Sequence, residues 1–322
     1  MPKVTPTDQS KPPRDSDRRD IYRTITDKII AAIENNPGEP VMPWHRGGFR
    51  PVIPTNAATG NEYRGVNILS LWVTSLERGY DSGTFATYKQ WASLGAQVRK
   101  GESASPIVFY REIEKTRDGG TGNPFTPGGA AEAETIRMAR GYWVFAVEQV
   151  DGYAIAPELP ANPIERIAAA DAYVAATGAK VIVGGRQAYY RPSTDTIHMP
   201  DEARFFDTEG RTRSLAFFQT LHHELAHWTS AERRLNRQLG KRFGDDAYCA
   251  EEVIAETAAC FIGARLGIAP EPHPDHARYI LHWLTVMKSD ARAMFAAAAK
   301  AQEIVTYLDG LQPDAALARA AA

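Results

Sequence analysis

The chain has 322 residues with a formal net charge of −2, and 43% of its residues are hydrophobic and 24% are charged. This composition is typical of a globular protein of one or two domains, and the near-neutral charge excludes a general electrostatic attraction to nucleic acid or to anionic membranes. Because no run of about 18 apolar residues is present, we expect no membrane-spanning segment and no membrane partner.

The first half of the chain carries signals for both helices and strands. Apolar residues at helical spacing predict three helices, at residues 20–35, 66–78 and 87–94. Runs of β-branched and aromatic residues predict two strands, at residues 106–113 and 141–147. The Gly- and Pro-rich residues 117–135 between them predict a mobile loop. We therefore predict an α+β domain over residues 20–150, after a polar, disordered tail at 1–19 that is no signal peptide.

The second half reads as mostly helical. A linker rich in proline and glycine is predicted at residues 151–163. Apolar periodicity beyond it predicts five helices, at residues 164–176, 212–230, 247–266, 274–287 and 291–308. Three short strands are predicted at residues 180–183, 188–191 and 196–199. The fold class is therefore α+β with two domains, the second being a helical domain with a small sheet over residues 164–310, before a tail at 311–322.

The two cysteines bear on the cellular compartment. Cys249 and Cys260 lie eleven positions apart in one predicted helix, which separates them by about 16 Å along the helix axis. That distance is too long for a disulfide. Reduced cysteines are typical of cytoplasmic proteins, so we expect a cytoplasmic protein.

A metal-binding pattern lies in the predicted helix at residues 212–230. His223 and His227 are four positions apart and therefore share one helix face, where both imidazoles can reach one ion. Glu224 follows the first histidine, the position of the general base in metallopeptidases. The ligand chemistry favours Zn²⁺, with Mn²⁺ as an alternative. The sequence thus predicts a metal site with Glu224 as the catalytic residue.

A catalytic zinc site needs a third protein ligand. The metzincin pattern is absent, because Ser230 and Arg233 stand where its glycine and third histidine would be. The next predicted helix carries Glu251, Glu252 and Glu256, an arrangement similar to that of gluzincins. We predict Glu252 as the third ligand and Glu256 as a support that hydrogen-bonds a ligand histidine, and Glu251 remains the alternative ligand.

Local composition is compatible with binding to single-stranded nucleic acid. Residues 40–111 hold eight Lys or Arg against four Asp or Glu, a local net charge of +4, and ten aromatic residues. Proteins that bind single strands combine basic residues with aromatic platforms on which bases stack. The candidate contacts in loops or at helix starts are Trp44, Arg46, Arg50, Tyr63, Arg64, Arg99 and Lys100.

Several stretches together resemble the ArdC-like antirestriction proteins. In the second half these are Leu-His-His-Glu-Leu-Ala-His-Trp-Thr at 221–229, Arg-Arg-Leu-Asn-Arg at 233–237 and Glu-Glu-Val-Ile-Ala-Glu at 251–256. In the first half they are residues 61–67, 84–89 with Gly95, 98–102 and 144–149. The resemblance spans about residues 21–266. One departure is Ser230, which replaces a glycine and is expected to alter the helix end without affecting the metal.

This resemblance implies an N-terminal domain that binds single-stranded DNA, shared with plasmid primases of the TraC type, and a zincin-like C-terminal domain. It also implies protection of incoming mobile-element DNA, such as a conjugating plasmid, from host restriction. A second hypothesis is a cytoplasmic zinc metallopeptidase that its N-terminal domain directs to a peptide or protein substrate. A third is a metal-stabilised interaction module without chemistry. The sequence indicates no oligomeric state.

Overall fold

The computed structural model describes residues 15–36, 40–46, 49–115, 134–154, 163–207, 212–237, 246–268 and 276–313. Most of the loop predicted at 117–135, the middle of the linker predicted at 151–163 and the outer parts of both predicted tails lie outside the described residues. Within the described residues, no helix has the length and apolar character needed to cross a membrane.

The N-terminal half is built on a long β-ribbon. Strands β4 (Ser105–Lys115) and β5 (Glu134–Ala146) pair antiparallel from Ser105 opposite Val144 to Lys115 opposite Glu134. The ribbon continues into β2 (Thr84–Ala86) and β1 (Thr55–Asn56), in the order β1-β2-β5-β4, and β3 (Gln97–Val98) pairs with β6 (Val150–Asp151). Helices α1 (Asp15–Glu34), α2 (Val66–Arg78) and α3 (Tyr88–Ser93) accompany these strands.

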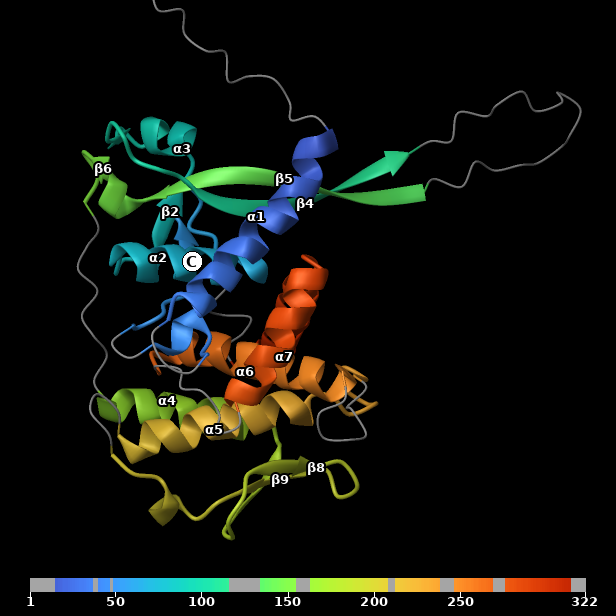
Figure 1. The fold of residues 1–322 in the computed structure, drawn as a ribbon. Coiled ribbons are helices and arrows are strands. Elements are labelled where there is room, and N and C mark those ends of the chain that lie inside the picture. The colour runs from blue at the N-terminus through green and yellow to red at the C-terminus, as the bar shows by residue number, and fades with distance from the viewer. Residues whose placement is uncertain are drawn as a thin grey trace, which may run out of the picture.

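The C-terminal half stacks helices on a small sheet. After α4 (Pro163–Ala176), strands β7 (Lys180–Val183), β9 (Thr196–Met199) and β8 (Tyr189–Arg191) form a sheet in that order. Helices α5 (Arg213–Trp228), α6 (Asp246–Leu266), α7 (His276–Ser289) and α8 (Ala293–Gly310) follow. The β4–β5 ribbon and the small sheet lie at opposite ends of the molecule, with helices between them (Figure 1).

The predicted helices and the α+β class are confirmed. Turn chemistry explains the accurate helix ends: Gly79 ends α2 with a left-handed φ of 67°, and Thr87 and Gln90 form a capping box at the start of α3. Residues 15–19, which were assigned to the disordered tail, belong instead to α1. The sequence analysis missed them because the apolar periodicity that marks this helix begins only at Ile21. The strands β1, β2, β3 and β6 were not predicted, since two or three residues show no recognisable alternation.

The two halves share one hydrophobic core, which the sequence did not predict. Buried apolar residues of α1 and α2 form a single cluster with those of α5, α6 and α8. At its centre the ring of Trp72 on α2 lies edge-on to Phe261 on α6, with centroids 5.6 Å apart. At the rim, Arg265 of α6 pairs with Glu62 at 2.8 Å. The halves are therefore packed as one body.

Candidate metal centre

The candidate site lies between α5 and α6, which pack closely along their length. A methyl group at Gly263 of α6 would lie 2.9 Å from the carbonyl oxygen of Ile268 and 3.2 Å from Oε1 of Gln219 on α5. The missing side chain thus allows the close approach of the two helices. Because α6 is apolar and buried on most of its circumference, any carboxylate on it needs a specific partner.

The three side chains that the sequence analysis predicted as metal ligands, His223, His227 and Glu252, converge on one point. The Nε2 atoms of His223 and His227 are 3.1 Å apart. A carboxylate oxygen of Glu252 lies 3.3 Å from Nε2 of His223, and its other oxygen lies 3.5 Å from Nε2 of His227. Such separations fit donor atoms that each lie about 2.0–2.2 Å from a shared ion. The structure therefore brings together the set proposed from the sequence, and this donor set fits a divalent metal.

The other nitrogen of each histidine has its own carboxylate partner. Nδ1 of His223 lies 2.9 Å from Oε2 of Glu256, and Nδ1 of His227 lies 3.2 Å from Oε1 of Glu251. These bonds fix the ring orientation and keep Nε2 turned inward, as carboxylates do around metal-bound histidines. Glu251, the alternative ligand in the sequence analysis, therefore faces the outer nitrogen of His227.

Arg237 completes the surroundings of Glu251. Its guanidinium donates to both carboxylate oxygens, at 2.8 and 3.2 Å, and to the carbonyl oxygen of Ala226 at 2.7 Å. This fork ties Glu251 of α6 to the end of α5. Sequence reasoning missed the support role of Glu251. Its partner Arg237 lies fourteen positions earlier in the sequence, and no local sequence pattern predicts that the two side chains are in contact.

The electrostatics of the centre suit a cation. Burial lowers the pKa of His223, but hydrogen bonds to Glu252 and Glu256 outweigh this effect and hold the pKa well above its ordinary value. Burial also lowers the pKa of His227, but the hydrogen bonds that its ring donates to Glu251 and Glu252 outweigh this effect, and the pKa rises to about 9. The carboxylates of the centre thus favour positive charge where the two Nε2 atoms converge.

The two residues that flank His223 in sequence, His222 and Glu224, are both buried. Glu224, the predicted general base, is buried beside the site at 4% exposure. His222 is fully buried between the rings of Tyr173 and Phe218, and this burial lowers its pKa to about 3. His222 is therefore neutral at physiological pH and packs as a core residue. Ser230 accommodates the chain after α5 without a left-handed backbone.

The seven predicted DNA contacts do not form one exposed group. Trp44 and Tyr63 are buried at 1% and 4% exposure, so neither ring offers a face to a base in this conformation. The remaining five are basic: Arg46 is half-buried and donates to the carbonyl oxygen of Ala32, whereas Arg50, Arg64, Arg99 and Lys100 are exposed. Of these four, Arg64 donates to Thr306 on α8, and Arg99 pairs with Glu102 and Asp151.

Exposed aromatic residues lie instead on the β4–β5 ribbon. Phe109 and Trp143 are 51% and 54% exposed. Phe109 meets Tyr142 edge-on with centroids 5.5 Å apart, and the guanidinium of Arg140 lies 5.3 Å from the centre of the Tyr142 ring. The cross-strand register places Phe109 opposite Arg140. Phe109, Arg140 and Tyr142 lie on one face of the ribbon, whereas Trp143, the next residue after Tyr142, points to the opposite face. We call Phe109, Arg140 and Tyr142 the ribbon surface. The sequence analysis assigned Phe109 and Tyr142 to strands without predicting their exposure, and it left Arg140 outside the predicted strands.

Family comparisons match both halves of the chain. Residues 19–145 match the N-terminal domain of the anti-restriction factor ArdC, and residues 168–300 match the zincin-like metallopeptidase family MPTase-PolyVal. The two matches confirm the predicted two-domain arrangement. They also agree with the resemblance seen in the sequence stretches around residues 61–102 and 221–256.

Two curated relatives cover most of this chain. The uncharacterized protein y4eC of Sinorhizobium fredii (strain NBRC 101917 / NGR234) is 44% identical over 297 residues, which is 92% of this chain and 94% of that protein. A DNA primase TraC of Escherichia coli is 33% identical over 306 residues. That match takes in 90% of this chain and 27% of the primase.

Solved structures with the same fold come from plasmid R388. Its antirestriction protein ArdC, in a metal-free form, matches with a TM-score of 0.72 at 36% identity, covering 92% of this chain and 98% of that one. A Mn(II)-bound form matches with a TM-score of 0.70 at 34% identity, covering 91% and 98%. Because this likeness extends over nearly the whole of both chains, the protein belongs to the ArdC antirestriction family, with an ArdC N-terminal domain followed by a zincin-like metallopeptidase domain.

Proposed function

We propose that the protein binds single-stranded DNA through its N-terminal half and holds a divalent metal ion, Zn²⁺ or Mn²⁺, at His223, His227 and Glu252. Acting in the cytoplasm, it would cover DNA that enters the cell on a mobile element and so keep restriction enzymes from it. The observation that carries the DNA-binding part is the ribbon surface, which offers the exposed ring of Phe109 and the half-buried ring of Tyr142 beside the cation of Arg140 in the ArdC-type half.

The chemistry of the ribbon surface suits a single strand. An unpaired base has a free π-face, and stacking on an aromatic side chain contributes about 1–3 kcal/mol per base whatever its sequence. Arg140 would contact a phosphate without reading a base edge. Bases within a duplex are already stacked on each other, so the same rings would favour single strands. We therefore expect weak sequence preference and marked salt dependence.

Replacing Phe109 with alanine should weaken binding to a single-stranded oligonucleotide by about 1–3 kcal/mol, because the ribbon surface loses one stacking platform. Arg140→Ala should reduce the slope of log affinity against log salt by about 0.7, the value for one phosphate contact on a single strand. Fluorescence anisotropy of the full-length variants, with the single strand and its duplex at several salt concentrations, measures both effects.

The matched control is Phe206→Ala, which removes another exposed ring, 72% accessible, from the C-terminal half. It should leave DNA affinity unchanged. Equal losses in Phe206→Ala and Phe109→Ala would mean that the ribbon surface is not the DNA contact. Absence of single-strand binding by the wild-type protein would reject the DNA-binding function itself.

A zinc peptidase activity is the second candidate function, favoured by the buried Glu224 beside His223. A bound zinc ion supplies a Lewis acid and makes a nearby water more acidic. The Glu224 carboxylate would accept the proton of that water and pass it to the departing amine. A purely structural metal site needs no such base.

Glu224→Ala is expected to retain the metal, because Glu224 is not among the three converging donors, and to leave single-strand binding unchanged. Any cleavage of protein substrates should disappear in this variant. Metal content by atomic emission, DNA anisotropy and a casein-cleavage assay on the same preparations separate these effects. Cleavage that persisted in Glu224→Ala would exclude Glu224 as the general base, and loss of DNA binding with metal retained would contradict two separable functions.

A further inference from the structure

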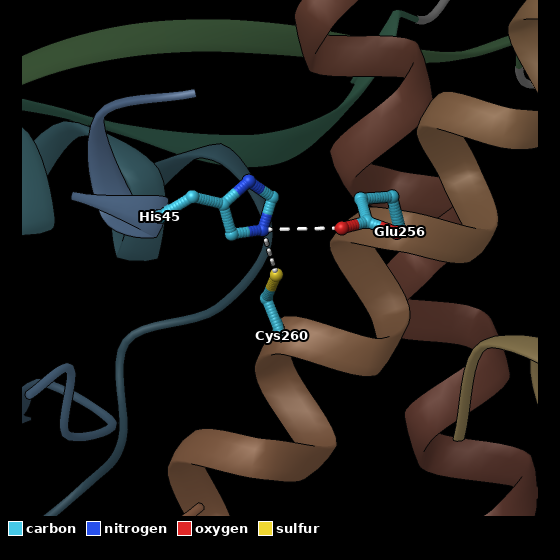
Figure 2. A group of neighbouring side chains, drawn as sticks. All are labelled: His45, Glu256 and Cys260. Atoms are coloured by element: carbon cyan, nitrogen blue, oxygen red, sulfur yellow. Dashed lines mark hydrogen bonds and ion pairs between the residues drawn. The ribbon is translucent and has the colours of Figure 1, made fainter. Parts of the chain in front are cut away.

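A further carboxylate–imidazole contact crosses from one half of the protein to the other. His45 lies in a short 3₁₀ turn, Pro43–His45, of the N-terminal half, and its Nε2 points toward α6. It lies 3.2 Å from Oε1 of Glu256 and 3.1 Å from Sγ of Cys260 (Figure 2). All three side chains are buried. The same Glu256 uses its other oxygen, Oε2, to hold Nδ1 of His223.

These three donor atoms could in principle hold a second metal ion, but two features favour hydrogen bonding. Structural zinc sites are almost always four-coordinate, and within the described residues this group has three donors. A metal ligand must also be a thiolate, whereas burial and the nearby Glu256 carboxylate raise the pKa of Cys260 well above its ordinary value. A protonated Nε2 of His45 facing a carboxylate oxygen needs no ion.

We propose that His45 is a positioning residue for the metal centre: its N–H holds Glu256, which in turn orients His223. Two imidazoles, one from each half of the chain, then share one buried carboxylate. The metal centre is therefore completed by the N-terminal half, although all its direct ligands lie on α5 and α6. This inference rests on the metal site of the proposed function.

The geometry gives the link a clear energetic role. Nε2 of His45 lies 3.2 Å from Oε1 of Glu256 and holds this buried carboxylate on the side away from His223, and buried charges depend on such partners. Without His45 the Glu256 side chain would be freer to turn, which weakens its bond to Nδ1 of His223. Removal of such an outer partner typically lowers metal affinity by about 10- to 100-fold. The rest of the donor set, including Glu251 on His227, would remain in place.

The test is a Co²⁺ titration of the full chain, followed by visible absorption, with His45→Leu and His45→Gln as a matched pair. Both replacements fill similar space, but only glutamine carries an N–H near the position of Nε2. We expect His45→Leu to bind Co²⁺ about 10- to 100-fold more weakly than wild type and His45→Gln to recover most of the affinity. Urea unfolding of both variants checks that they are folded.

Four outcomes would overturn the proposal. Wild-type affinity in His45→Leu would mean that the link has no effect on the metal. An equal loss in the leucine and glutamine variants would assign His45 to packing alone. A sulfur-to-cobalt charge-transfer band that disappears in Cys260→Ser would make the cluster a metal site of its own. If the wild type bound no Co²⁺, the proposed metal site would fall as well, which distinguishes that failure from the first two.

Discussion

Replacing Glu252 with alanine should weaken metal binding by more than about 100-fold, whereas Glu251→Ala should cost only about 10- to 100-fold, the range for an outer hydrogen-bond partner. The reason is the position of each carboxylate. Glu252 faces both inner nitrogens, at 3.3 and 3.5 Å, while Glu251 reaches only the outer nitrogen of His227. Removing Glu252 would therefore delete the proposed third ligand, whereas removing Glu251 would leave the inner nitrogens and Glu252 in place.

Mn²⁺ and Zn²⁺ affinities, measured by competition with a chromogenic chelator, check this order. Glu303→Ala is a suitable control, because this exposed acid on α8 forms an ion pair with Lys300 at 2.8 Å. It is not among the converging donors, so its removal should leave metal affinity unchanged. If Glu251→Ala proved the more damaging of the two, the ligand assignment would be reversed. An equal loss of metal affinity in the two variants would indicate that both acids contact the metal.

Much of this centre could be predicted because its information is local. His223 and His227 share a helix face by their spacing alone, and Glu252 and Glu256 repeat that spacing on the next helix. Helical periodicity then places each set on one face. The partner of Glu251 could not be predicted in the same way, because Arg237 lies in the segment after α5 and reaches back across it through the tertiary fold.

The exposure of the candidate DNA contacts, in contrast to the metal centre, could not be predicted from local sequence patterns. Trp44 stands in a Pro-rich stretch, which predicts an exposed loop, yet its ring is packed 6.1 Å from that of Trp72. Its burial depends on the packing of the N-terminal half against α6, which no local pattern encodes. Phe109 shows the reverse: it follows the buried Ile107 and Val108 in an apolar run that predicts a strand, yet its ring is 51% exposed. The β4–β5 ribbon to which it belongs extends beyond the helices (Figure 1).

The burial of Trp44 has its physical origin in the core that the two halves share. A chain of two independent domains would expose the Pro-rich loop and leave the metal site wholly to the second domain. Here the same packing that buries Trp44 also brings His45 to Glu256. The interface between the halves is thus part of the site, and stability measurements on this interface test the fold and the proposed link together.

Trp72→Ala should lower the free energy of unfolding by about 3–5 kcal/mol, the cost of removing a large buried aromatic side chain. The ring is 2% exposed, contacts Phe261 of α6, and donates its indole N–H to the carbonyl oxygen of Val52 at 2.7 Å. Because the shared core couples α2 to α6, we expect one cooperative urea transition, shifted as a whole. Circular dichroism at 222 nm, which reports helices of both halves, follows it.

Phe206→Ala, an exposed aromatic truncation, should change the free energy of unfolding by no more than about 0.5 kcal/mol. Two separate transitions, with only one shifted by Trp72→Ala, would show that the halves unfold independently and would contradict a shared core. A single shifted transition would instead mean that a perturbation in the N-terminal half also loosens α6, the helix that carries Glu252 and Glu256. Occupancy of the metal centre and integrity of the N-terminal half would then be linked through packing as well as through His45.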